Sequence, residues 1–184
     1  MKITLAAVAI FFFASLLLAQ QDAQYIIHNS LMKIKAGKKG ESLEWQNDNV
    51  SVRFDYRTGE FITYLTNTDF VKPGEDIGMT KESGATKRQL TLSGTLPISD
   101  IINQQQSAQN YKVELNLEAD DLDMAETILF DMLITKPESS NSKSYRVFTL
   151  NGILYNDQTN LPAFVGYDNE IQLWLIFTGF MNVQ

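Results

Sequence analysis

The sequence contains no cysteine and only one histidine, His28. The absence of cysteine excludes disulfide bonds, thiol nucleophiles, thiolate zinc sites and a cysteine-linked lipid anchor. Any catalytic triad would have to use His28 as its base, and the chain has no Gly-x-Ser-x-Gly motif for a serine nucleophile. We therefore expect a protein that is not an enzyme and that needs no metal or cofactor.

Basic residues are also scarce. The 184 residues include 15 Lys and Arg against 22 Asp and Glu, which gives a formal net charge of -7. Nucleic-acid binding requires a basic surface for the phosphates, so this class of partner is excluded. Global disorder is excluded as well, because 44% of the residues are hydrophobic and 11% are aromatic. The length is that of one domain.

Only the first residues form a long apolar run. Lys2 precedes an apolar stretch at residues 3–18 that closes on Ala19, before a polar segment. A basic start, an apolar middle and a small residue at the end are the parts of a secretory signal peptide, and the stretch is short for a spanning helix. We expect cleavage after Ala19 and a single domain at residues 20–184 that is secreted, either periplasmic or extracellular; an uncleaved anchor is the alternative.

The rest of the chain alternates between apolar and polar residues with a period of two. Val50, Val52, Phe54 and Tyr56 alternate with polar residues, and residues 111–118 repeat the pattern. Such alternation predicts half-buried strands. Further strand-like runs, rich in β-branched and aromatic residues, occupy residues 61–70, 89–96, 128–135, 145–154 and 171–183.

Short polar turns separate these runs. Residues 57–59 predict a tight hairpin, with Gly59 at the position that needs a positive φ. Residues 98–109 could form one short helix, and residues 122–133, which also fit a helical face, are interpreted as a loop followed by a strand. The predicted fold is an all-β, antiparallel barrel or sandwich of about eight strands with at most one short helix.

The last predicted strand has apolar residues on both faces. Leu175 and Phe177 face one way, whereas Trp174, Ile176 and Phe180 face the other. Such a strand is central, lies beneath another segment, or faces lipid. A membrane barrel therefore stays open as an alternative.

Two groups of residues are candidate sites. Asp120, Asp121 and Asp123 crowd a nine-residue acidic run at 118–126, which is either a solvated turn or a calcium site. The second group consists of the inward-facing apolar residues, which either fill a core or line a ligand pocket. From strand alternation these residues are Phe54, Tyr56, Tyr111, Val113, Phe130, Leu175 and Phe177.

Three segments carry a resemblance to a known family. They are the hairpin VSVRFDYRTGEFITY at residues 50–64, the strand LSGTL at 92–96 and the segment NGILYNDQTNLPA at 151–163. Their Asp-x-x-Thr-Gly hairpin, and the late glycine-containing strand followed by a turn and a proline, resemble the YceI-like family. The resemblance implies a lipocalin-like antiparallel barrel that binds a polyisoprenoid or similar lipid in an apolar tunnel.

Two functions follow as expectations. The first is a secreted, non-enzymatic binding protein that holds an apolar lipid or isoprenoid-like ligand in a β-barrel. The alternative is an envelope or extracellular β-domain that acts through protein–protein contacts without a small-molecule ligand. A pocket of roughly 300–1,000 Å³ would favour the first, and a filled core would favour the second.

Overall fold

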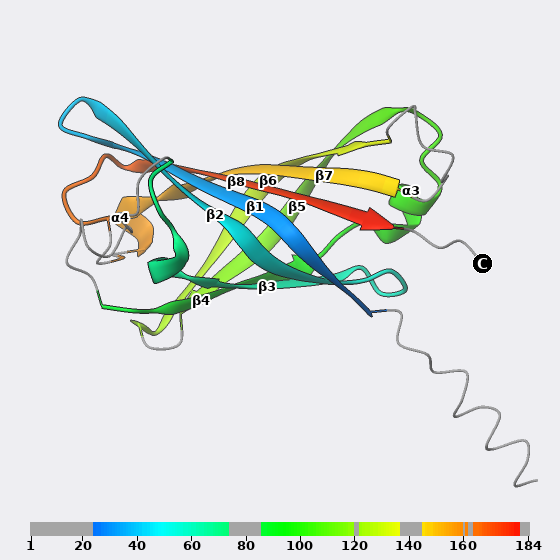
Figure 1. Ribbon diagram of the computed structural model, residues 1–184, viewed down its shortest axis with the longest axis horizontal. Coiled ribbons are helices and arrows are strands. Elements are labelled where there is room, and N and C mark those ends of the chain that lie inside the picture. Colours follow the sequence, from blue (N-terminus) through cyan, green and yellow to red (C-terminus); the bar gives the residue numbers. More distant parts are fainter. Residues whose placement is uncertain are drawn as a thin grey trace, which may run out of the picture.

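The protein is a closed, eight-stranded antiparallel β-barrel with its strands in sequence order (Figure 1). The computed structural model describes residues 24–73, 86–119, 122–136, 145–159, 161 and 164–180. The predicted signal peptide at residues 1–19 lies outside these residues. The elements are β1 (Gln24–Lys38), β2 (Glu41–Asp55), β3 (Glu60–Thr66), η1 (Asn67–Asp69), β4 (Gln89–Thr95), α3 (Ile98–Ile102), β5 (Ala108–Ala119), β6 (Met124–Thr135), β7 (Tyr145–Tyr155), α4 (Asn156–Thr159) and β8 (Glu170–Phe180).

The barrel confirms the predicted fold class and decides between its two architectures. Every predicted strand is present. In the segment interpreted as a loop followed by a strand, only Leu122 and Asp123 precede β6, and residues 124–133 belong to it, so this strand begins four residues earlier than predicted. The charged residues of the two clearest strands, such as Arg53, Lys112 and Glu114, lie on the outer wall, and the apolar ones lie inside.

The structure adds two features that the sequence did not predict. Residues 24–48 form β1 and the first half of β2, for which we expected no strand. A second short helix, α4, occupies the expected turn after β7. The helix α3 lies in the segment expected to hold one, but it starts after Pro97 and has no side-chain cap bond. Among the described residues, neither α-helix has the length or apolar composition needed to cross a membrane.

The barrel consists of four long strand pairs that are joined along four shorter seams. The strand pairs β1–β2, β3–β4, β5–β6 and β7–β8 are paired along most of their length; β5–β6 runs from Ala108↔Thr135 to Ala119↔Met124. The seams are shorter, with three pairs between β2 and β3, four between β4 and β5, and six each at β6–β7 and β1–β8. Neighbouring strands therefore part from each other at one end of each seam.

One hairpin turn shows how local chemistry sets the register. The Asp55 carboxylate accepts hydrogen bonds from the backbone N–H of Arg57, at 2.7 Å, and of Thr58, at 3.3 Å. Gly59 follows with a φ of +79°, as predicted, and its N–H donates to the Asp55 carbonyl at 2.8 Å. An aspartate at the start of a turn and a glycine in the left-handed region are the residues that such a turn requires.

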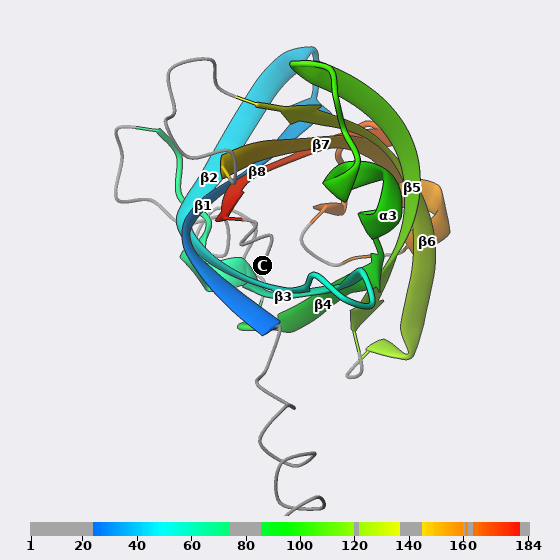
Figure 2. The same cartoon turned by 90° about the vertical axis from the view of Figure 1, so that its right-hand side faces the viewer.

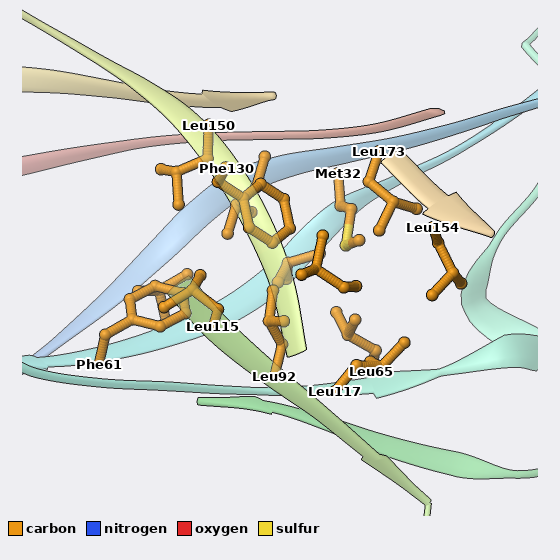
Figure 3. Packing of buried hydrophobic residues seen from close by; sticks show 14 of the residues in the cluster. Met32, Phe61, Leu65, Leu92, Leu115, Leu117, Phe130, Leu150, Leu154 and Leu173 are labelled. Carbon is orange, nitrogen blue, oxygen red and sulfur yellow. The ribbon is translucent and has the colours of Figure 1, made fainter. Parts of the chain in front are cut away.

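The interior is filled with apolar side chains from all eight strands (Figure 3). One group of aromatic rings lies in the half of the barrel nearest α3: Phe148 stacks on Phe177 with ring centroids 4.6 Å apart, and the centroids of Phe54 and Phe148 are 5.9 Å apart. Burial of each such side chain stabilises the fold by roughly 1.5–3 kcal/mol. The barrel therefore holds together without disulfides.

Candidate functional site

The seven residues predicted to bind a ligand all lie on the inner wall of the barrel. Five are buried, and Tyr56 and Tyr111 are partly buried against the core. Several of them pack on one another; the rings of Phe54 and Tyr56, for example, have centroids 4.5 Å apart. Their inward orientation is thus as predicted, and ligand binding by them stays a prediction.

The helix α3 covers the barrel at the end of these aromatic residues, where it lies within the ring of strands (Figure 2). Ile101 of the helix is fully buried, and the Gln104 side-chain amide just after it donates to the Ile134 carbonyl at 3.2 Å. Burial raises the pKa of the Tyr111 phenol, and the Asp100 carboxylate on α3 raises it further. Tyr111 is therefore a neutral hydroxyl at physiological pH.

A slot opens in the barrel wall where β6 and β7 part. Their pairing ends at Phe130↔Gly152, so that residues 124–129 and 153–155 run on without pairing to each other. The hollow between them has a volume of about 580 Å³. It is lined by Glu126, Thr127, Ile128, Leu129, Asp131, Asn151, Gly152, Ile153, Leu154, Tyr155, Gln158, Gln172, Leu173 and Trp174.

The floor of this slot is part of the barrel core. Ile128, Leu154 and Leu173 line it and are only 3–4% exposed. Figure 3 shows Leu154 and Leu173 pointing into the same interior as Met32. An apolar molecule in the slot would therefore contact the hydrophobic core directly.

Gly152 is the residue that closes the slot toward α3. A Cβ atom at this position would lie 2.7 Å from Cε1 of Phe130 and 3.1 Å from Cγ2 of Ile128. The Phe130 ring thus packs against the bare backbone of β7, a close approach that needs glycine. None of the seven predicted site residues lines the slot, and Phe130 reaches its edge only through this contact with Gly152.

The walls of the slot carry unusually exposed apolar side chains. Leu129 is 52% exposed, and Ile153 and Tyr155 are each 40% exposed, while Trp174 beside them is half-buried. Large apolar side chains that gather around one hollow mark a binding surface more often than scattered ones do. One sign of this surface is visible in the sequence, namely the outward-facing Trp174 on a strand with two apolar faces.

Two smaller hollows on the outer wall differ in chemistry. One, of about 400 Å³, has Arg53, Asp55 and Glu60 in its lining. The other, of about 370 Å³, has Lys35 and Asp168 among several polar residues. Each of these linings has three charged residues among eight, against two among fourteen in the slot. The slot therefore suits an apolar ligand better, because a charge that a ligand buries must keep a polar partner.

The acidic run gives no metal centre among the residues that can be placed. Asp120 and Asp121 lie outside the described residues, and Asp123 and Glu118 are exposed. Within the described ranges no group of three acidic or histidine side chains is positioned to hold a metal ion. A solvated turn and a calcium site therefore both stay predictions for this acidic run.

Comparison with known proteins identifies the fold. No protein-family model and no curated protein matches the sequence. A solved structure does match: a polyisoprenoid-binding domain from Saccharophagus degradans implicated in plant cell wall breakdown, with a TM-score of 0.66 and 9% identity, covering 87% of this chain and 99% of that one. The chain has the fold of that domain. The YceI-like barrel expected from the sequence is thus confirmed as a fold.

Proposed function

We propose that this protein is a non-enzymatic binding protein that holds an isoprenoid or acyl chain in the slot between β6 and β7. The observation that carries the proposal is the slot itself. Its volume of about 580 Å³ falls in the range of small-molecule sites, roughly 300–1,000 Å³. Core residues form its floor and exposed apolar residues form its walls.

The shared fold supports the same class of ligand. The solved domain with this architecture is a polyisoprenoid-binding domain. Fold alone does not assign a ligand, because one fold hosts many functions. The proposal therefore rests on the slot, and the likeness agrees with it.

Burial of the chain supplies the affinity. Each buried carbon contributes about 0.8 kcal/mol, so a fifteen-carbon chain would gain roughly 12 kcal/mol. The loss of translational and rotational freedom takes back at least about 4 kcal/mol. The remainder corresponds to a dissociation constant in the micromolar range.

Tryptophan fluorescence tests the proposal directly. Trp174 lines the slot, whereas the other tryptophan, Trp45, is fully buried in the barrel. Titration with geranylgeraniol should shift the emission of the wild type to shorter wavelength, because the ligand replaces water around the Trp174 ring, and Trp174→Phe should remove that response without preventing binding. Binding itself is followed by thermal shift, since a ligand at a hundredfold excess over Kd adds about 2.7 kcal/mol of stability.

Two charged substitutions locate the site. Leu129→Glu and Ile153→Glu place a carboxylate in the apolar walls and should weaken binding at least tenfold. Tyr64→Glu is the matched control, because Tyr64 is 52% exposed on β3 and does not line the slot. Equal affinities in all three variants would refute the slot as the binding site. If no lipid changes the melting temperature of the protein, the alternative function through protein–protein contacts is favoured.

Secretion is part of the proposal and needs its own test. The basic and apolar leader at residues 1–19 supports export with cleavage after Ala19. Terminal sequencing of the protein isolated from its own cells should then begin at Gln20. A sequence that begins at Met1 would contradict cleavage.

A further inference from the structure

The slot is apolar on its floor and walls, but its rim has a distinctive electrostatic character. Of the residues that line it in the described part of the chain, two are charged, Glu126 and Asp131, and both are acids. Arginine and lysine, which proteins use to bind phosphates and carboxylates, are missing from this lining. The net charge of -7 for the whole chain acts in the same direction.

Three lysines lie on neighbouring strands opposite residues of the slot. One of them, Lys35, lies opposite Gln172 and lines the separate hollow of about 370 Å³, together with Asp168 and Glu170. The other two have acidic partners. Lys112 lies on β5 opposite Asp131 and contacts that carboxylate at 2.6 Å. Lys33 lies on β1 opposite Trp174 and contacts Glu44 at 2.8 Å. Each of these pairs is neutral as a unit, whereas no ion pair between described residues neutralises Glu126.

Side-chain amides supply the remaining polar groups of the rim. Asn151 and Gln172 lie on the outer faces of β7 and β8, and Gln158 projects from α4. Between described residues, the structure contains no hydrogen bond from these three side chains. A carboxamide offers both donors and an acceptor, so together they can serve a head group that donates, accepts or does both.

We infer that the ligand carries an uncharged, hydrogen-bonding head group, such as an alcohol, a quinone or an amide, and not a phosphate or a carboxylate. This inference rests on the proposed function and specifies the ligand class of the same slot. The apolar chain contacts Ile128, Leu154 and Leu173, and the head group meets the carboxamides at the rim. A phosphate there would face Glu126 without a compensating cation, which is unfavourable close to a low-dielectric core.

The test compares two ligands with the same chain. Geranylgeraniol and geranylgeranyl monophosphate share twenty carbons and differ only in the head group. We expect the wild type to bind the phosphate at least tenfold more weakly than the alcohol. The difference between the two affinities should become smaller in 1 M NaCl, where the Debye length falls to about 3 Å. Salt screens the repulsion between charges, but it does not change how well the shape of the ligand fits the slot.

Charge reversal provides the decisive variants. Glu126→Lys should increase the affinity for the phosphate at least tenfold. Its affinity for the alcohol should stay within threefold of that of the wild type. Glu60→Lys makes the same charge change on the exposed surface of β3, outside the slot, and should leave the ratio of the two affinities unchanged within twofold. Gln172→Leu should weaken the alcohol threefold or more, because a donor and an acceptor are lost from the rim.

The outcomes separate this inference from the function on which it rests. If neither ligand binds the wild type, the proposed function fails. If the phosphate binds as tightly as the alcohol or more tightly, the inference of a neutral head group is wrong, but the proposed function of binding an apolar chain is kept. If Gln172→Leu leaves the alcohol affinity unchanged, recognition by the carboxamides is wrong.

Discussion

The contact between Gly152 and Phe130 can be measured as a coupling free energy. Gly152→Ala would place a methyl carbon 2.7–2.8 Å from two atoms of the Phe130 ring, well inside van der Waals contact. Overpacking of a core by one methyl group typically destabilises the fold by about 1–3 kcal/mol. In a Phe130→Leu background the ring is gone and the methyl group has room, so the two substitutions together should cost less than their separate effects predict.

Urea denaturation of the wild type, both single variants and the double variant gives the interaction free energy. We expect at least about 1 kcal/mol of favourable coupling, which exceeds the roughly 0.3–0.5 kcal/mol within which independent sites add. The same cycle with Phe61→Leu is the control, since Phe61 is equally buried but is not among the atoms nearest Gly152. Additive behaviour in the Phe130 cycle would refute the close approach of the two strands.

Three further predictions concern the barrel itself. Phe54→Ala should lower the free energy of unfolding by about 3–5 kcal/mol as a buried ring is lost, whereas Lys112→Ala, which removes an exposed ion pair, should change it by less than about 1 kcal/mol; calorimetry distinguishes the two. Asp55→Asn weakens the acceptor of the β2–β3 turn and should cost roughly 0.5–2 kcal/mol in urea unfolding, and no effect would show that the turn does not depend on the carboxylate. Burial and the Asp100 carboxylate raise the pKa of Tyr111 in the folded state. The stabilisation from its neutral hydroxyl is therefore complete below the unfolded pKa, near 10, and is lost as the pH rises through the folded pKa. Tyr111→Phe should flatten this decline of stability at high pH, and an unchanged pH profile in the variant would contradict the prediction.

Alternation along single strands was enough to predict most of the barrel. Val113 and the other residues of β5 keep one parity throughout, so their inward face could be read from the sequence. The β1–β2 hairpin was missed because the inward face changes from odd-numbered to even-numbered residues within each strand. The buried positions shift from Ile27 to Ser30 in β1 and from Asn47 to Val50 in β2, and the pairing register shifts in the same region. A β-bulge interrupts the period of two, and the buried Ser30 and Asn47 hide the pattern further.

The slot could not be predicted in the same way. It exists because the pairing of β6 with β7 stops at Phe130↔Gly152, and the register between two strands depends on packing across the whole barrel. The sequence did indicate that Trp174 needed cover on the outer face. It placed the predicted site residues among the aromatics near α3, whereas the slot lies beyond Gly152, toward α4.

The division into long strand pairs and short seams has a consequence for folding. The β1–β2 and β5–β6 pairs form between residues that are close in the sequence, whereas the β1–β8 seam joins Leu31 to Ile176, and closing so long a loop costs more conformational entropy. Closure of this seam should therefore come late in folding, and amide exchange should be faster along the three-pair β2–β3 seam than in the twelve-pair β5–β6 hairpin. A molecule bound in the slot would contact both the β5–β6 and the β7–β8 strand pairs. It would bridge the part of the barrel wall where β6 and β7 are not paired, and it would therefore slow amide exchange in both strand pairs.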